Sequence, residues 1–159
     1  MKELLELLER NYCRAAGQLA VMLNRSEEEI QAMIEKYEKE KIIVKYQTIV
    51  DWEKVGVDKV TAVIEVKITP QREVGFDAIA ERIARYPEVR SVYLMSGGYD
   101  LSVTVEEASL KEVANFVSTK LSTIDGVVGT TSHFMLKKYK GAGVLLNDKE
   151  ETHRLVITP

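Results

Sequence analysis

The stretch Ser91-Val-Tyr-Leu-Met-Ser-Gly-Gly-Tyr-Asp-Leu-Ser-Val-Thr-Val105 decides the fold of the second half of the chain. Apolar and polar residues alternate on both sides of a break at residues 96–100, which is typical of two antiparallel strands joined by a turn. Gly97 and Gly98 are expected to supply the positive φ angles of that turn. A turn alone does not require Tyr99 and Asp100. Their presence indicates either an edge that faces a ligand or a plain hairpin loop with a solvated carboxylate.

The segments around this hairpin complete a βαββαβ order. Residues 60–67 alternate as a strand, and a helical stripe of apolar residues follows at residues 76–83. A second helical stripe spans residues 110–121, and residues 127–139 predict a long last strand. This order is that of a ferredoxin-like fold, a four-stranded antiparallel sheet with both helices on one face.

The other face of that sheet is left uncovered. We expect it to carry Val, Ile, Tyr and Met side chains, including Val63, Val92 or their alternates, and monomers rarely expose such a patch. Sheet-to-sheet dimerisation is therefore expected. The tail also contains the run Arg154-Leu-Val-Ile-Thr158, which is a candidate edge strand in its own subunit or in a neighbour.

The first fifty or so residues have helical periodicity instead. Two amphipathic helices lead to Asn24-Arg25, which predicts a tight turn in the left-handed conformation. Ser26 to Glu29 predicts a capping box at the start of a third helix. With a β hairpin over residues 42–50, this order predicts a winged helix-turn-helix, and a fragment of a helical bundle is the alternative.

The periodicity changes near residues 51–58, and we place a domain boundary there. The sequence thus predicts an α+β chain of three parts. These are a winged helix-turn-helix at residues 1–52, a ferredoxin-like domain at residues 53–140 and a tail at residues 141–159.

Composition excludes several classes of protein. The chain has 159 residues, 45% of them apolar, which fits one ordinary domain or two small ones. No apolar run approaches the roughly 18 residues of a membrane helix, and the acids in MKELLELLER exclude a secretory signal, so we expect a cytoplasmic protein. Cys13 is the only cysteine, and His133 and His153 lie far apart, so no disulfide, metal site or cofactor is expected. No residues have catalytic spacing either, so we expect no enzyme.

Together these features resemble the Lrp/AsnC (feast/famine) family of prokaryotic transcription regulators over nearly the whole chain. The residues that carry the resemblance are Leu19 to Ile43, Phe76 to Val89, the loop Met95-Ser-Gly-Gly-Tyr-Asp100, and Asp125-Gly-Val127 leading into Thr130-Thr-Ser132. The resemblance implies a C-terminal domain that binds an amino acid or a related small metabolite. It also implies homodimers that assemble into tetramers, octamers or larger discs, and a promoter DNA partner with a palindromic site.

The resemblance further places an effector site at the glycine loop and the start of the last strand, between dimers. Gly97 and Gly98 would let an α-carboxylate reach bare backbone amides, and the Asp100 carboxylate would suit an α-ammonium. Asp100 as a simple cap of the turn is the alternative. The candidate effector-binding residues are Ser96, Gly97, Gly98, Tyr99, Asp100, Thr130, Thr131 and Ser132.

The sequence departs from the family where DNA would be read. Between Ser26 and Glu40 stand two lysines and six glutamates, so this helix has a net charge of 2 − 6 = −4. Glutamates repel the phosphates that supply most of the affinity for DNA, although oligomerisation can offset a weak single contact. Lys41 also stands where relatives often have a glycine, at a cost of about 1 kcal/mol if that position is left-handed. The candidate DNA-binding residues are Arg14, Arg25, Gln31, Lys36, Lys41 and Lys45.

Three functions follow from these observations. The first is a DNA-binding transcription regulator that responds to an amino acid or a related metabolite. The second, favoured by the acidic helix, is a metabolite-sensing or oligomerisation module whose helix-turn-helix has drifted. The third is an enzyme similar to the siroheme decarboxylases, which share this two-domain layout. That chemistry would call for basic groups around a tetrapyrrole, and the sheet offers only His133.

Overall fold

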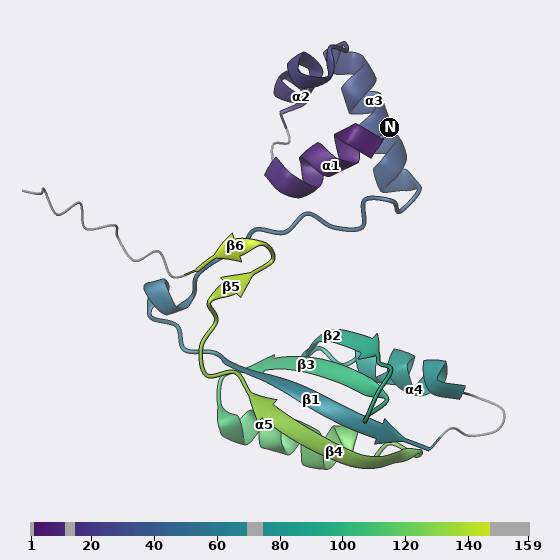
Figure 1. The fold of residues 1–159 in the computed structure, drawn as a ribbon, viewed down its shortest axis with the longest axis vertical. Helices are drawn as coiled ribbons and strands as arrows, with labels where there is room; N and C mark the ends of the chain where they lie inside the picture. Colours follow the sequence, from purple (N-terminus) through teal and green to yellow (C-terminus); the bar gives the residue numbers. More distant parts are fainter. Residues whose placement is uncertain (1, 12–14, 70–74, 147–159) are drawn as a thin grey trace, which may run out of the picture. The chain divides into compact units, whose positions relative to one another are not determined.

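The computed structural model describes residues 2–11, 15–69 and 75–146. The chain divides into two compact units, Met1–Ile49 and Val50–Pro159, each with its own hydrophobic core (Figure 1). Within the described part, no helix is both long enough and apolar enough to cross a membrane. Arg14 and the expected edge strand at Arg154 to Thr158 lie outside the described residues.

The first unit contains the three helices α1 (Lys2–Asn11), α2 (Ala16–Leu23) and α3 (Glu27–Lys39). The turn after α2 forms as predicted, because Asn24 has a left-handed φ of 50°. The capping box is also confirmed. The Ser26 hydroxyl accepts a hydrogen bond from the Glu29 amide at 3.2 Å, and the Glu29 carboxylate accepts one from the Ser26 amide at 3.4 Å.

The core of this unit is small, and all three helices contribute to it. Its buried side chains are Leu4, Ala16, Leu19, Ala20, Ile30, Ile34 and Tyr37. These are the apolar positions at helical spacing in the sequence, so the amphipathic pattern correctly predicts which faces meet.

The β hairpin expected over residues 42–50 is not formed. The amides of Ile42 and Ile43 both donate to the Tyr37 carbonyl, at 2.9 and 3.1 Å, and close the end of α3. Residues 44–50 then continue with no strand assigned to them. The run contains no Gly, Pro, Asn or Asp that could turn the chain back on itself, so its alternation predicts extended backbone but not a hairpin.

The second unit is built on four strands and two helices. The strands are β1 (Val60–Ile68), β2 (Val89–Leu94), β3 (Leu101–Glu107) and β4 (Val127–Phe134). The helices are α4 (Gly75–Ala84) and α5 (Leu110–Phe116), the latter extended by a π-helical turn, Val117–Leu121. The strands pair antiparallel in the order β2-β3-β1-β4, with both helices on one face (Figure 1). The ferredoxin-like fold is therefore confirmed.

Two details of this unit differ from the expectation. The last strand ends at Phe134 and not at Tyr139. The chain then forms a separate small hairpin from β5 (Lys140–Gly141) and β6 (Val144–Leu145). A 3₁₀ turn, Glu53–Val55, precedes β1.

Strand register decides which side chains face the helices. Ile64 lies in the middle strand, fully buried, opposite Val103 of β3 and Ser132 of β4. Because directly opposed residues share a face, Val103 and Ser132 lie on the helix side with it. Val92 pairs with Val103 and packs against the core, so the expectation that it faces outward is wrong.

The open face of the sheet is also more polar than expected. Val63 does lie there, but most of its neighbours are hydroxyl-bearing or charged. The open-face residues are Thr61, Val63, Glu65, Lys67, Ser91, Tyr93, Ser102, Thr104, Glu106, Thr131 and His133. The alternation in the sequence correctly predicts that each strand has two faces. In β1, β2 and β3, most of the polar residues lie on the open face of the sheet and most of the apolar residues face the helices.

Candidate functional site

The loop between β2 and β3 is closed by one hydrogen bond of its own and fixed to the end of β1 by two more. The Met95 amide donates to the Asp100 carbonyl at 2.8 Å, and the Asp100 amide donates to the Val66 carbonyl at 3.0 Å. The Ile68 amide donates to Asp100 Oδ2 at 2.7 Å. Asp100 therefore supports the end of β1 with its side chain, as well as closing the loop with its backbone.

The tip of this loop is open. Ser96, Gly97 and Gly98 are exposed, and a Cβ atom at either glycine would have no neighbour within 4 Å. Gly97 has the positive φ expected of the turn, 149°, but Gly98 does not, so the expectation for Gly98 is wrong. The two glycines leave their backbone accessible to a small molecule.

The loop's other two candidates, Tyr99 and Asp100, are half-buried. An ionised carboxylate has about four lone-pair sites, and the Ile68 amide uses one of them. Asp100 can therefore hold β1 and still accept a hydrogen bond from a ligand ammonium. The two roles that the sequence left open are compatible.

The three candidates on β4 do not share a face. Thr130 pairs with Val66 and Ser132 with Ile64, which places both on the helix side, where they are half-buried. Thr131 pairs with Glu65 and is exposed on the open face. Thr130 is separated from the loop by β1, which is two strand spacings or roughly 10 Å. A molecule of amino-acid size is long enough to reach from one to the other.

The candidate DNA-binding side chains fall into two groups. On α3, the Gln31 amide donates to Glu35 at 3.1 Å, and the Lys36 ammonium lies 3.9 Å from Glu40. Outside α3, Arg25 follows the turn, and Lys41 and Lys45 line a hollow of about 240 Å³ beyond the helix end. Lys41 has a left-handed φ of 59°, which is the conformation for which the sequence analysis expected a lysine to be less stable than a glycine.

The six glutamates of the α3 segment are all exposed. Three of them, Glu27, Glu28 and Glu29, occupy the first turn, where carboxylates complement the helix dipole. A backbone hydrogen bond and the Ser26 hydroxyl lower the pKa of Glu28, which keeps that carboxylate ionised. The helix end that would enter a DNA groove is therefore strongly negative.

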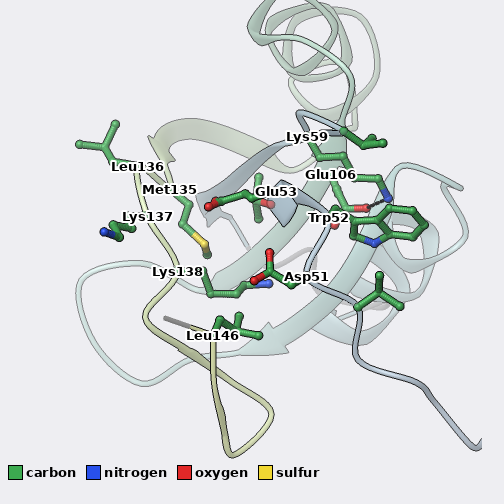
Figure 2. Close-up of a pocket in the computed structure, with 13 residues that line it drawn as sticks. Asp51, Trp52, Glu53, Lys59, Glu106, Met135, Leu136, Lys137, Lys138 and Leu146 are labelled. Atoms are coloured by element: carbon green, nitrogen blue, oxygen red, sulfur yellow. Dashed lines mark hydrogen bonds and ion pairs between the residues drawn. The ribbon is translucent and has the colours of Figure 1, made fainter. Parts of the chain in front are cut away.

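A hollow of about 100 Å³ lies at the end of the sheet away from the glycine loop (Figure 2). The Lys59 ammonium donates to Glu106 at 2.9 Å and lies 4.6 Å from the centroid of the Trp52 ring. Arg90 also donates to Glu106, at 3.1 Å. Burial would raise the pKa of Glu106, but the hydrogen bonds and charges of Lys59 and Arg90 outweigh it and lower that pKa.

Sequence reasoning did not predict the cluster of Trp52, Lys59 and Glu106. Lys59 and Glu106 are 47 positions apart, and only the pairing of Thr61 with Glu106 brings them together. The single tryptophan beside the domain boundary was the one available signal.

His133, the side chain that the sequence analysis considered for an enzyme, lies on the open face of the sheet. Its Nε2 lies 3.2 Å from Glu65 Oε1, so it has a carboxylate partner on the neighbouring strand. In the described part of the chain, no three His, Cys, Asp or Glu side chains are grouped as metal ligands.

Comparison with known proteins gives a consistent result. The family model of the Lrp/AsnC ligand binding domain matches residues 61–145. The uncharacterised HTH-type transcriptional regulator YugG of Bacillus subtilis (strain 168) is 50% identical over 158 residues, which are 99% of this chain and 95% of YugG.

Two solved structures share the fold at lower identity. One is the transcriptional regulator NMB0573 from Neisseria meningitidis in complex with L-methionine. It has a TM-score of 0.71 and 23% identity, with coverage of 91% of this chain and 93% of that one. The other is the feast or famine regulatory protein Rv3291c from M. tuberculosis, complexed with L-methionine. It has a TM-score of 0.70 and 20% identity, with coverage of 87% and 90%.

Proposed function

The chain belongs to the Lrp/AsnC family of transcriptional regulators, and from that premise we propose that its two units divide the work of regulation. The first unit binds promoter DNA, and the second binds an amino acid or a related small metabolite. The observation that carries the effector half is the loop at residues 95–100. It is anchored to β1 by two hydrogen bonds, yet its glycine tip faces open space.

The loop offers both kinds of group that an amino acid needs. The exposed backbone at Gly97 and Gly98 suits an α-carboxylate, and the remaining lone pairs of Asp100 suit an α-ammonium. Ser96, Tyr99 and the hydroxyl groups of β4 are available for further hydrogen bonds. The two fold relatives named above contain L-methionine, which makes methionine a sensible first probe.

The effector would act on DNA binding through assembly. We propose a homodimer that associates into tetramers, octamers or larger assemblies and places pairs of helix-turn-helix units on a palindromic site. A coupling of order 1–3 kcal/mol between effector and DNA is typical of such regulators. A regulator of this kind works in the cytoplasm with the chromosome, and we assign it no catalytic role.

The effector site is tested with two loop variants. Because Gly98 has no positive φ and no neighbour around its Cβ position, G98V adds bulk at the proposed site without backbone strain. It should abolish effector binding and leave the unfolding temperature unchanged. D100N removes the charge and should weaken binding by about 1.5–3 kcal/mol. A thermal-shift screen of the twenty amino acids finds the ligand, and calorimetry measures its affinity.

Two neighbouring threonines provide the control. T130V and T131V make the same chemical change on opposite faces of β4. A single ligand touches one face of the strand, so one variant should weaken binding and the other should not. If G98V and D100N both bind as tightly as the parent, the loop is not the effector site.

The drifted helix-turn-helix remains a second candidate, because the net charge of −4 on the α3 segment opposes DNA binding. Titrating the protein against its own promoter at several salt concentrations distinguishes a drifted module from a DNA-binding regulator. If the helix-turn-helix binds DNA, R25A and K45A should each flatten the salt dependence by about one unit, and Q31A should change sequence preference. A parent protein that binds no duplex at low salt would favour the drifted module.

A further inference from the structure

The segment that follows β4 contains the lysine strip, which we define as Lys137, Lys138, Tyr139 and Lys140. All four residues are exposed. From Gly126 to Asn147 the chain has no Asp or Glu, whereas acids are frequent elsewhere in the sequence. The strip is therefore a local concentration of positive charge in a chain whose net charge is −3.

The three lysines do not have the same surroundings. Lys138 extends into the hollow beside Asp51, whereas Lys137 points away from it (Figure 2). The Lys137 ammonium lies 5.2 Å from the centroid of the Tyr139 ring, which restrains the side chain without neutralising it. Lys140 is held by the pairing of β5 with β6. Among the described residues, neither Lys137 nor Lys140 lies within 4.0 Å of a carboxylate oxygen.

These features are those of a phosphate-binding surface. Exposed ammonium groups without carboxylate partners release counterions from DNA when they contact its phosphates, and this release supplies most non-specific affinity. The neighbouring Tyr139 adds a hydroxyl of the kind that often contacts the DNA backbone. Contacts to phosphates carry no sequence information, so the contribution of the strip would not depend on sequence.

The acidic α3 segment supplies the reason for a second surface. A helix with a net charge of −4 cannot provide the phosphate contacts that its own docking requires. Residues 44–49 lead from the closed end of α3 to the second unit, and six extended residues span at most roughly 22 Å. Lys137 and Lys138 line the same hollow as Val50 and Asp51, where the second unit begins. The strip therefore stays within reach of any duplex that α3 occupies, at a high effective concentration.

We propose that the lysine strip of the second unit contacts the DNA backbone next to the site occupied by α3. This inference rests on the proposed DNA-binding function. It assigns the two units complementary tasks: α3 selects the sequence, and the strip supplies part of the charge-dependent affinity.

The test is the double variant K137Q/K140Q, which leaves Lys138 and its surroundings in place. The control R82Q/K111Q removes two exposed positive charges from α4 and α5 instead. Binding of a labelled promoter duplex and of an unrelated duplex is measured by fluorescence anisotropy over a series of salt concentrations. For K137Q/K140Q, the slope of log K against log salt should fall by up to about 1.8, or roughly 0.9 for each phosphate that is no longer neutralised. Both duplexes should be affected equally, and the control should keep the parental slope.

The possible failures can be told apart. If K137Q/K140Q keeps the parental slope while R25A lowers it, the strip does not contact DNA and the helix-turn-helix proposal survives. If the parent binds neither duplex at low salt, the proposed function fails together with this inference. If K137Q/K140Q changes the sedimentation coefficient but not the salt slope, the strip is an interface between copies of the chain, which also overturns the proposal.

Discussion

Among the described residues, the first unit (Met1–Ile49, the helical unit) encloses seven buried apolar side chains, whereas the second (Val50–Pro159, the sheet unit) encloses thirteen. In the helical unit, order comes from groups close in sequence, such as the Ser26 and Glu29 capping box. In the sheet unit it comes from distant pairs, such as Ile64 with Val103 and with Ser132. The helical unit is therefore specified locally but has little buried apolar surface to spare. The sheet unit is specified by long-range pairing and has a larger reserve of stability.

The largest effect is expected from cavities in the two cores. I30A should cost the helical unit about 2–5 kcal/mol, which is comparable to the whole stability of a unit this small. I64A removes the same atoms from the sheet unit, which should become less stable but stay folded. Trp52 is the only tryptophan and belongs to the sheet unit, so its fluorescence follows that unit alone. Far-ultraviolet circular dichroism follows both units.

In I30A, the part of the helical signal that comes from α1, α2 and α3 should disappear at 25 °C, while α4 and α5 keep theirs and the Trp52 transition stays at its parental temperature. In I64A, the Trp52 transition should move to lower temperature. If I30A shifted the Trp52 transition as far as I64A does, the two units would unfold as one, and the comparison would be wrong.

Smaller changes in the free energy of unfolding are expected at two backbone positions, one in each unit, and the two changes have opposite signs. Gly126 in the sheet unit has a φ of 93°, and a Cβ there would lie 2.8 Å from Ile79 Cδ1. G126A should therefore destabilise the sheet unit by about 2 kcal/mol. Lys41 in the helical unit has a φ of 59°, so K41G should stabilise that unit by up to about 1 kcal/mol.

Urea titrations followed by Trp52 fluorescence and by circular dichroism measure both changes. K39G is the matched control, because Lys39 lies in the last turn of α3 and a glycine there should destabilise the helix. A K41G protein no more stable than its parent would show that the left-handed position carries no strain.

The smallest effect is expected from acid. A hydrogen bond from Lys120, together with its charge, lowers the pKa of Glu88 in the sheet unit, although burial opposes this. A carboxylate with a lowered folded-state pKa stabilises the fold above its unfolded pKa, about 4.3, and this contribution disappears as the pH falls toward the folded value. The pair is partly exposed, so its contribution should not exceed about 1 kcal/mol.

The free energy of unfolding of the sheet unit should therefore fall between pH 5 and pH 3. K120M removes the partner and should reduce the loss. K111M, which removes an exposed lysine of α5, should not. Equal losses in all three proteins would mean that the ion pair does not contribute.

Much of the fold could be predicted from the sequence, because its signals lie within a few residues of one another. Asn24, the capping box and the helical stripes depend on hydrogen bonds and packing over three or four positions. The break at residues 96–100 likewise located a hairpin between two strands. For the candidate effector site, the sequence indicated which residues to consider but not which of them lie on the same face of the sheet. At residues 42–50, alternation alone predicted a hairpin. The hairpin is not formed, because the run contains no residue that favours a turn.

The sequence by itself determined the order of the helices α1 to α5 and of the strands β1 to β4, and the negative charge of α3. Only the tertiary structure decided which face each strand presents, because register depends on a partner that the strand's own sequence does not contain. That is why Val92 packs inward, why Thr131 is separated from Thr130 and Ser132, and why Lys59 meets Glu106. It also decided the second role of Asp100, since the Ile68 amide that it binds lies 32 positions away and reaches it only across the folded sheet.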